Sequence, residues 1–277
     1  MDHAPHPAAA SGRPPDDVGS ELPGGALVVG HGTRAEHGQS EFLALAAQVG
    51  RLLAPTPVEP CFLELAAPSI AAGVERLVAR GARRLVVAPT LLFSAGHANH
   101  DIPNAVSEAC CASANRWGIK LAWEQAATLE EHPALVELSL AREREAVAGR
   151  APRERCGRLL VGRGSGDVRA IRAFWEFAAE RRAAGQVPAQ EGCFLAVAEP
   201  RLPEALERMA GDGWDRVIVI PHLLFDGELI TGVNGRVADM ARRFPAIDWV
   251  VAQRLGPDRA IAAALCDRVL QATKGLQ

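Results

Sequence analysis

Apolar runs alternate with segments of helical periodicity along most of the chain. Four runs in its first half have the length of buried strands: 26–29, 60–63, 85–88 and 119–123. After the first run, apolar residues recur every three or four positions, as one face of a helix requires, at Phe42, Leu45, Val49 and Leu52. We expect three prolines in the first turns of helices: Pro68, Pro103 and Pro133. The alternation predicts an α/β fold with parallel, doubly wound sheets and right-handed crossovers.

The whole pattern occurs twice in the chain. Three blocks recur at a spacing of 132 residues: 30–33 at 162–165, 61–64 at 193–196, and 89–93 at 221–225. Beyond residue 101 the spacing shortens to 126, since Trp123 then matches Trp249. Blocks that share one spacing over such a length indicate an internal duplication.

The duplication predicts two tandem domains of ordinary size, 25–150 and 151–277, joined by a link rich in glycine, proline and arginine at 149–153. Residues 1–24, rich in proline, alanine and glycine, are expected to form a disordered leader. We expect the two domains to face each other across a cleft formed by the loops that follow their strands. The sequence does not indicate the order of the strands.

Candidate reactive residues follow three successive strands of the first half. His31 lies between two glycines after the first strand, Glu64 follows the second, and His97 follows the third. Parallel strands end at one edge of a sheet, so these three side chains can converge on one point. Imidazole and carboxylate groups form a ligand set suited to Fe, Co, Ni or Zn, and they can also accept protons near neutral pH.

Each of these residues also has an ordinary structural interpretation. His31 could cap backbone groups at the turn, Glu64 could cap a helix or form a salt bridge, and His97 could be a solvated loop residue. The duplication separates these alternatives. The second half keeps the surrounding glycines, prolines and Leu-Leu-Phe core but has Arg163, Ala196 and Leu229 at the matching positions. Residues needed only for folding should recur, so their restriction to one half favours a single asymmetric site.

Composition and charge narrow the classes of function. The formal net charge of −3 provides no general attraction to nucleic acid or to acidic lipid. No apolar run approaches the roughly 20 residues of a membrane helix. The six cysteines show no CxxC spacing, so we expect reduced thiols and a cytoplasmic protein. His222, the single histidine of the second half, is expected to end a strand, with a second metal site as the alternative.

Three segments resemble the signature blocks of the CbiX-type sirohydrochlorin chelatases: 28–34 (VVGHGTR), 62–70 (FLELAAPSI) and 89–103 (PTLLFSAGHANHDIP). The resemblance extends over nearly the whole chain after residue 24, and the second half resembles the degenerate repeat of the long, two-domain members. It implies a chelatase-like fold and metal insertion into sirohydrochlorin without nucleotide hydrolysis, with His31 and His97 as the matched histidines. Ala67 departs from the pattern, because many relatives have an acidic or amide residue there.

The expected reaction assigns roles to these residues. We hypothesise that His31 and His97 bind the metal and accept pyrrole protons, while Glu64 orients one imidazole or carries a proton away. The carboxylates of the macrocycle are expected to contact Arg34 and the amides of Gly32 and Thr33. His100 is a further candidate near the substrate.

No cofactor is expected beyond the substrate metal, which is Co²⁺, Fe²⁺ or Ni²⁺, and the tetrapyrrole is the other partner. Neither nucleic acid nor a membrane is an expected partner, and we expect a monomer because the two halves supply both walls of the cleft. Two alternatives remain. One is a non-catalytic carrier of metal or tetrapyrrole. The other is phosphoryl transfer through His31, which is disfavoured because Arg34 is the only nearby arginine.

Overall fold

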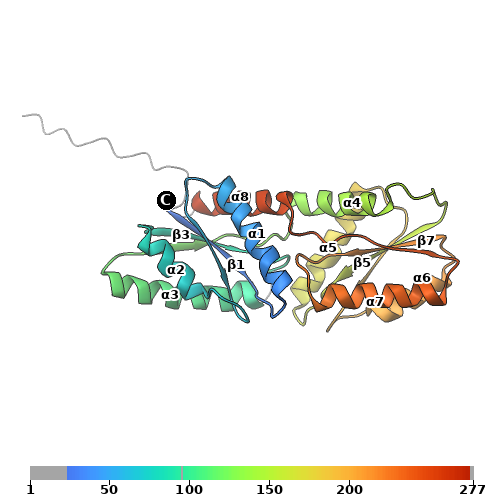
Figure 1. Ribbon diagram of the computed structural model, residues 1–277, viewed down its shortest axis with the longest axis horizontal. Coiled ribbons are helices and arrows are strands. Elements are labelled where there is room, and N and C mark those ends of the chain that lie inside the picture. Colours follow the sequence, from blue (N-terminus) through green and yellow to red (C-terminus); the bar gives the residue numbers. More distant parts are fainter. Residues whose placement is uncertain (1–23, 95, 275–277) are drawn as a thin grey trace, which may run out of the picture.

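The computed structural model describes residues 24–94 and 96–274, so the predicted leader lies outside the described residues except for Gly24. It has two lobes side by side, each built on a parallel sheet (Figure 1). The first sheet has the order β2-β1-β3-β4, with bounds β1 Gly25–Gly30, β2 Val58–Phe62, β3 Arg84–Pro89 and β4 Ala122–Gln125. The second has the order β6-β5-β7-β8, with bounds β5 Cys156–Gly162, β6 Gln190–Phe194, β7 Arg216–Pro221 and β8 Asp248–Val251. The prediction of two parallel α/β domains is confirmed.

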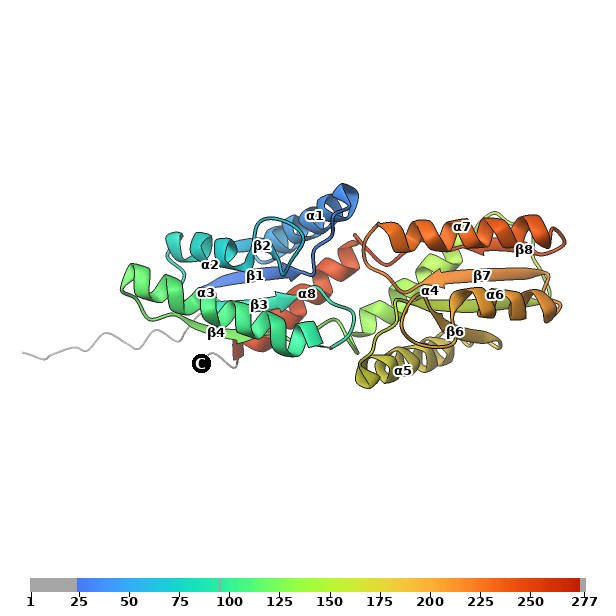
Figure 2. The same ribbon diagram turned by 90° about the horizontal axis from the view of Figure 1, so that it is seen from below.

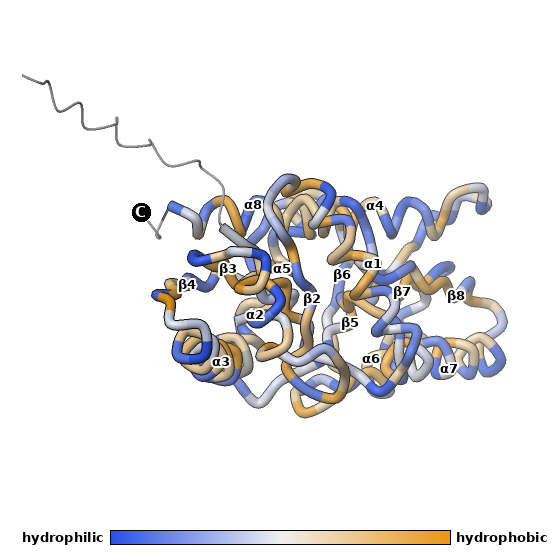
Figure 3. Tube along the Cα trace, turned by 60° about the vertical axis from the view of Figure 1, so that its left-hand side comes forward, coloured by the Kyte–Doolittle hydropathy of each residue, from blue (hydrophilic) through white to orange (hydrophobic). Residues whose placement is uncertain are grey.

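Helices cover both faces of each sheet. Their bounds are α1 Glu36–Leu52, α2 Ile70–Ala79, α3 Ile102–Trp117, α4 Pro133–Val147, α5 Val168–Ala184, α6 Leu202–Gly211, α7 Glu228–Arg243 and α8 Arg259–Thr273, with a short π-helix, η1, at His97–Asp101. Hydrophilic and hydrophobic residues alternate along α3 and α7, as expected for helices with one buried face (Figure 3). No helix in the described part of the chain combines the length and apolar character that crossing a membrane requires.

The duplication extends to the pairing of individual residues. Ala26 pairs with Val58 in the first sheet, and Arg158 pairs with Gln190 in the second, so both partners are shifted by the same 132 positions. At the far edges Arg84 pairs with Ala122 and Arg216 with Asp248, which reproduces the shorter spacing of 126 beyond residue 101.

Local sequence accounts for most element boundaries. All six residues of β1 are buried, in agreement with an apolar strand in the middle of a parallel sheet. Pro103 and Pro133 lie in the first turns of α3 and α4, as predicted. The prediction for Pro68 was wrong, because α2 begins at Ile70 and the side chain of Ser69 caps it by accepting a hydrogen bond from the Ala72 amide.

The two lobes exchange their last helices. α4 ends the first repeat but packs against α5, β7 and β8 of the second sheet, whereas α8 ends the second repeat and packs against α1, β3 and β4 of the first. Figure 1 shows α8 (red) above the first lobe and α4 (green) above the second. A division of the chain at residue 150 therefore separates the two repeats, but not the two lobes in space.

Matching arginines fasten the exchanged helices. Arg142 of α4 donates from Nε to the carbonyl of Arg254, at 3.2 Å, and pairs with Asp258 at 2.6 Å. Arg268, the equivalent residue of α8, donates from Nε to the carbonyl of Thr128 at 2.9 Å. One apolar core continues through the exchanged helices from the first sheet to the second. The lobes are thus held in a defined relative position.

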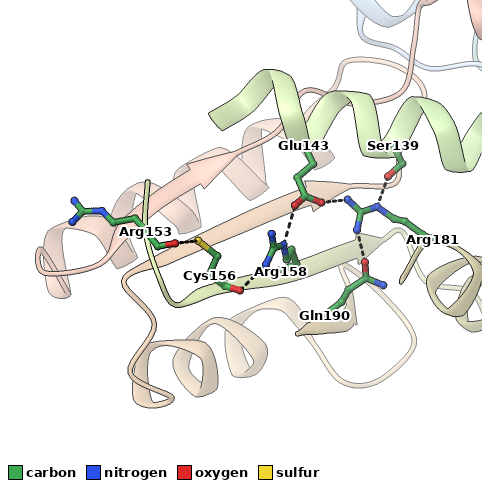
Figure 4. Close-up of polar contacts among 7 residues, drawn as sticks. All are labelled: Ser139, Glu143, Arg153, Cys156, Arg158, Arg181 and Gln190. Atoms are coloured by element: carbon green, nitrogen blue, oxygen red, sulfur yellow. Dashed lines mark hydrogen bonds and ion pairs between the residues drawn. The ribbon is translucent and has the colours of Figure 1, made fainter. Parts of the chain in front are cut away.

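A buried group of charges anchors α4 on the second lobe (Figure 4). Glu143 of α4 accepts a hydrogen bond from Arg158 of β5, at 2.9 Å, and forms an ion pair with Arg181 of α5. Arg181 is fully buried, and its guanidinium also donates to Ser139 and Gln190. A buried guanidinium needs this many acceptors because it has lost its contact with water.

Candidate active site

The carboxyl ends of the strands in the two sheets face each other. In Figure 2 the arrows of β1 and β3 point toward the second lobe, and the arrow of β7 points back toward the first. Two matching aromatic contacts join these ends: Phe93 lies 6.4 Å from Phe174, and Phe225 lies 5.9 Å from Phe42, between ring centroids. The facing arrangement agrees with the prediction. A cleft between the two edges stays a prediction.

The turn after β1 is held against the turn after β2. The amide of Glu64 donates to the carbonyl of His31 at 3.0 Å, and the amide of Leu63 donates to Gly30 at 2.9 Å. Gly32 has φ of +101°, and a Cβ there would lie 1.7 Å from the carbonyl oxygen of Glu64. Only glycine fits this approach of two backbones. Gly32 therefore brings the backbones of His31 and Glu64 together.

The side chains of His31 and Glu64 also meet. The Nδ1 atom of His31 lies 3.4 Å from Oε1 of Glu64, with the imidazole 24% and the carboxylate 51% exposed. At this separation the contact is electrostatic, and a carboxylate beside Nδ1 favours the tautomer whose Nε2 atom carries the free lone pair. The predicted convergence of these two residues is confirmed, and their partial exposure leaves the pair open to a ligand.

His97 begins η1, eight residues after β3 ends at Pro89, so its backbone follows the third strand as predicted. Its side chain lies outside the part of the chain that the structure describes. Among the described residues, no group of three histidine, cysteine, aspartate or glutamate side chains is placed to hold a metal ion. Shared metal binding by His31 and His97 accordingly stays a prediction.

The predicted substrate-binding residues lie around the same edge. α1 begins at Glu36, so the amides of Gly32 and Thr33 precede the helix, and the Thr33 hydroxyl accepts a hydrogen bond from Ala35 at 3.1 Å. Arg34 is exposed. His100 is exposed in η1. Hydrogen bonds from Arg169 lower the pKa of Asp167 in the second lobe, and the charge of His100 adds a smaller effect in the same direction. His100 therefore lies on the side of the first lobe that faces the second.

The second lobe repeats the backbone of the site without its reactive side chains. The amide of Ala196 donates to the carbonyl of Arg163 at 2.9 Å, as Glu64 does to His31. Gly164 has φ of +88°, and its Cβ would lie 1.8 Å from the Ala196 carbonyl. The two turns thus have one geometry, although one presents a histidine and the other an arginine.

His222, which directly follows β7, is a buried residue that the sequence did not predict to be buried. Its ring lies 4.1 Å from that of Phe177 and 5.2 Å from that of Phe93, and neither ring nitrogen has a hydrogen-bond partner among the described residues. Burial, reinforced by the nearby Arg181, lowers the pKa of His222 to about 3. The imidazole is therefore neutral at physiological pH. No signal in the sequence separates a buried from a solvated histidine at a strand end.

Two parallel α/β lobes with facing strand ends, one of which carries a paired imidazole and carboxylate, define a two-lobed protein of the chelatase type. The chain belongs to the CbiX family, whose model matches residues 25–146 and again residues 157–272. This double match agrees with the duplication and with the resemblance of the three sequence blocks.

Curated relatives and a solved structure are similar over most of the chain. A sirohydrochlorin ferrochelatase of Priestia megaterium is 30% identical over 254 residues, which cover 91% of this chain and 92% of the relative. A sirohydrochlorin cobaltochelatase of the same organism is 27% identical over 251 residues, covering 90% and 80%. The structure of SirB from Bacillus subtilis with Fe³⁺ superimposes with a TM-score of 0.79 at 26% identity, covering 91% of this chain and 96% of SirB.

Proposed function

We propose that this protein is an enzyme that inserts a divalent metal ion into sirohydrochlorin. The pairing of His31 with Glu64 at the strand ends is the observation that carries the proposal, because the second repeat keeps the same backbone but lacks both side chains. Membership of the CbiX family and similarity to ferrochelatases and cobaltochelatases over most of the chain support it.

Metal insertion requires that the ion lose water, that the pyrrole N–H groups lose protons and that the ion be presented to one face of the macrocycle. His31 and His97 bind the ion through neutral imidazoles, which hold Zn-like ions at about 2.0–2.1 Å and release them again. Glu64 orients His31 through Nδ1 or receives the pyrrole protons. This division of roles is part of the proposal.

The macrocycle is contacted by residues around the same turn. Arg34 offers a guanidinium to a substrate carboxylate, Gly32 and Thr33 offer backbone amides, and His100 borders the site from η1. The metal itself is a substrate rather than a resident cofactor. The choice among Fe²⁺, Co²⁺ and Ni²⁺ is left open, because imidazole and carboxylate ligands do not select one of them by geometry. A cytoplasmic location and a monomeric state stay predictions.

The decisive experiment mixes the purified protein with sirohydrochlorin and Co²⁺ or Fe²⁺ and follows the absorbance of the macrocycle. An enzyme produces many equivalents of metallated product per protein, whereas a carrier gives a single stoichiometric change. Replacing His31 or His97 with alanine should reduce turnover by about 10²–10⁴, the range expected when a general base is lost. Glu64→Gln should have a smaller effect if it only orients His31.

Circular dichroism and thermal unfolding of each variant provide the control. Loss of turnover in a folded His31→Ala protein supports the proposal. Full activity in both histidine variants, or a wild-type protein that stops after one equivalent, contradicts it.

A further inference from the structure

The most exposed large apolar side chains belong to segments that follow the carboxyl ends of strands, the ends at which the two lobes face each other. Among the described residues, Val168 is 78%, Val197 64% and Leu65 50% exposed, more than any other large apolar side chain. Val168 is the first residue of α5, while Val197 and Leu65 each lie three residues beyond the ends of β6 and β2. All three therefore follow the carboxyl ends of strands. Exposed apolar groups that collect at one edge mark a binding surface more often than scattered ones do.

Two of these residues flank one loop of the second lobe. The position of a Cβ on Gly166 would lie 3.9 Å from a methyl group of Val197, so the β5–α5 loop passes close to Val197. Val168 follows that loop directly, and Arg163 begins it. We call Arg163, Val168 and Val197 the second-lobe platform.

Arg163 differs from most arginines of its lobe. Among the described residues its guanidinium forms no hydrogen bond or ion pair, and the side chain is exposed. Carboxylates pair with most of the others, including Arg158, Arg169, Arg172, Arg181, Arg201, Arg208, Arg216, Arg242 and Arg243. Asp167, four residues further along the chain, pairs instead with Arg169, whose hydrogen bonds lower the pKa of that carboxyl group. Arg163 is thus a cation available to a ligand.

The residues that replace His31, Glu64 and His97 in the second repeat all remove a metal-binding group. Arginine at the position of His31 has no lone pair for a metal, alanine at the position of Glu64 removes a negative charge, and Leu229 at the position of His97 adds apolar surface. Together they replace metal ligands with one cation and apolar groups. A tetrapyrrole, which is an apolar ring bordered by carboxylates, has the complementary chemistry.

We propose that the second-lobe platform binds the tetrapyrrole, with Arg163 on a carboxylate and Val168 and Val197 against the ring, while the first lobe handles the metal. The inference rests on the proposed function. It makes Arg163 a positioning residue, so its loss should weaken macrocycle binding and leave the metal chemistry of His31 in place.

The experiment measures two quantities for each variant: the Kd for sirohydrochlorin without metal, from quenching of its fluorescence, and the kinetic constants for metal insertion. For Arg163→Ala we expect Kd and KM for the macrocycle to rise about tenfold or more, as for a lost charge-assisted hydrogen bond, with kcat within about threefold of wild type. Arg163→Lys should recover part of the affinity. Val197→Asp should also raise Kd, because aspartate tolerates the positive φ of 64° at this position but repels carboxylates.

Matched controls lie on surfaces remote from the facing edges. Arg182→Ala removes an exposed arginine near the end of α5, and Leu52→Asp adds a charge at the last residue of α1. Both should keep wild-type Kd and KM. Suppose that Arg163→Ala and Val197→Asp have the same Kd and KM as these controls while the wild type binds and metallates sirohydrochlorin. The proposed role of the second-lobe platform is then wrong, and the proposed function stands. If the wild type neither binds nor metallates it, the proposed function itself fails.

Discussion

The two lobes share the same backbone arrangement but carry different side chains at the carboxyl ends of their strands. Their strand order, their residue pairing and the glycine turn after the central strand are the same. On that frame the first lobe presents His31 and Glu64, and the second presents Arg163 and Ala196. The glycines therefore fix the backbone geometry that both lobes share, whereas the side chains beside them differ between the lobes.

The lobes also differ in how each holds its exchanged helix. On the second lobe α4 is anchored by a buried polar cluster of Glu143, Arg158, Arg181, Ser139 and Gln190. The equivalent positions around α8 in the first lobe are all apolar: Val269, Ala26, Val49, Leu265 and Val58. The same helix–sheet contact is thus made once with charges and once with aliphatic packing. On the first lobe a charged Glu143 would be buried among aliphatic groups. The difference therefore favours α4 on the second lobe and α8 on the first.

Making the turn after β1 resemble the turn after β5 should change activity most. His31→Arg should lower metal insertion by about a thousandfold, because a metal ligand and proton acceptor is lost. Its free energy of unfolding should change little, since Arg163 occupies the same backbone geometry in the second lobe. Steady-state assays and urea unfolding measure the two quantities. An unfolded variant, or one with normal turnover, would contradict the equivalence of the two turns.

Breaking the polar anchor should have the next largest effect. Glu143→Val introduces the residue found at the equivalent position of α8 and leaves the buried Arg181 and the partly buried Arg158 without their carboxylate. We expect a loss of about 3–5 kcal/mol in the free energy of unfolding, the usual result of breaking a buried ion pair from one side. Urea unfolding followed by circular dichroism measures it.

The matched control replaces all five polar residues of the anchor with their first-lobe equivalents. Because no charge is then left unpaired, its stability should be close to wild type or higher, as found when buried ion pairs are exchanged for apolar groups. If this variant is as unstable as Glu143→Val alone, packing rather than charge explains the single substitution.

Alanine at either glycine turn should destabilise the protein by about 3 kcal/mol, because the backbone has positive φ and the new methyl group meets a carbonyl. The two variants should differ in activity. Gly32→Ala displaces Glu64 from His31 and should abolish turnover, whereas Gly164→Ala should keep kcat in the fraction that stays folded. Equal loss of kcat in both folded variants would show that the turns are not functionally distinct.

The smallest effect concerns His222, whose equivalent in the first lobe is Thr90. Burial lowers the pKa of His222 from 6.5 to about 3. Above pH 6.5 the residue is neutral in both states, but as pH falls toward 3 the unfolded chain binds a proton that the folded chain excludes. Stability should therefore fall on acidification, by about 2 kcal/mol between pH 7 and pH 5 from this residue. His222→Thr should remove that part of the pH dependence. If the urea midpoint shifts by the same amount between pH 7 and pH 5 in the wild type and in the variant, the prediction is wrong.

The α/β class, the duplication and the edge of the sheet on which the site lies can all be predicted from the residue pattern alone. Apolar runs and helical periods are local, and parallel strands end on one edge, so the sequence predicts that His31 and Glu64 lie close together. Once the strands pair, the matching register of the two sheets reflects the repeat spacing of 132 residues in β1, β2, β5 and β6.

The strand order, the exchange of α4 and α8, and the burial of Arg181 and His222 emerge only from the folded arrangement of the chain. These features depend on contacts between residues more than thirty positions apart, such as Glu143 with Arg181, and local periodicity does not encode them. The sequence alone does not distinguish an arginine that becomes exposed in the fold from one that becomes buried. Whether it pairs within the fold or stays available, as Arg163 does, depends on which distant side chains the packing brings beside it.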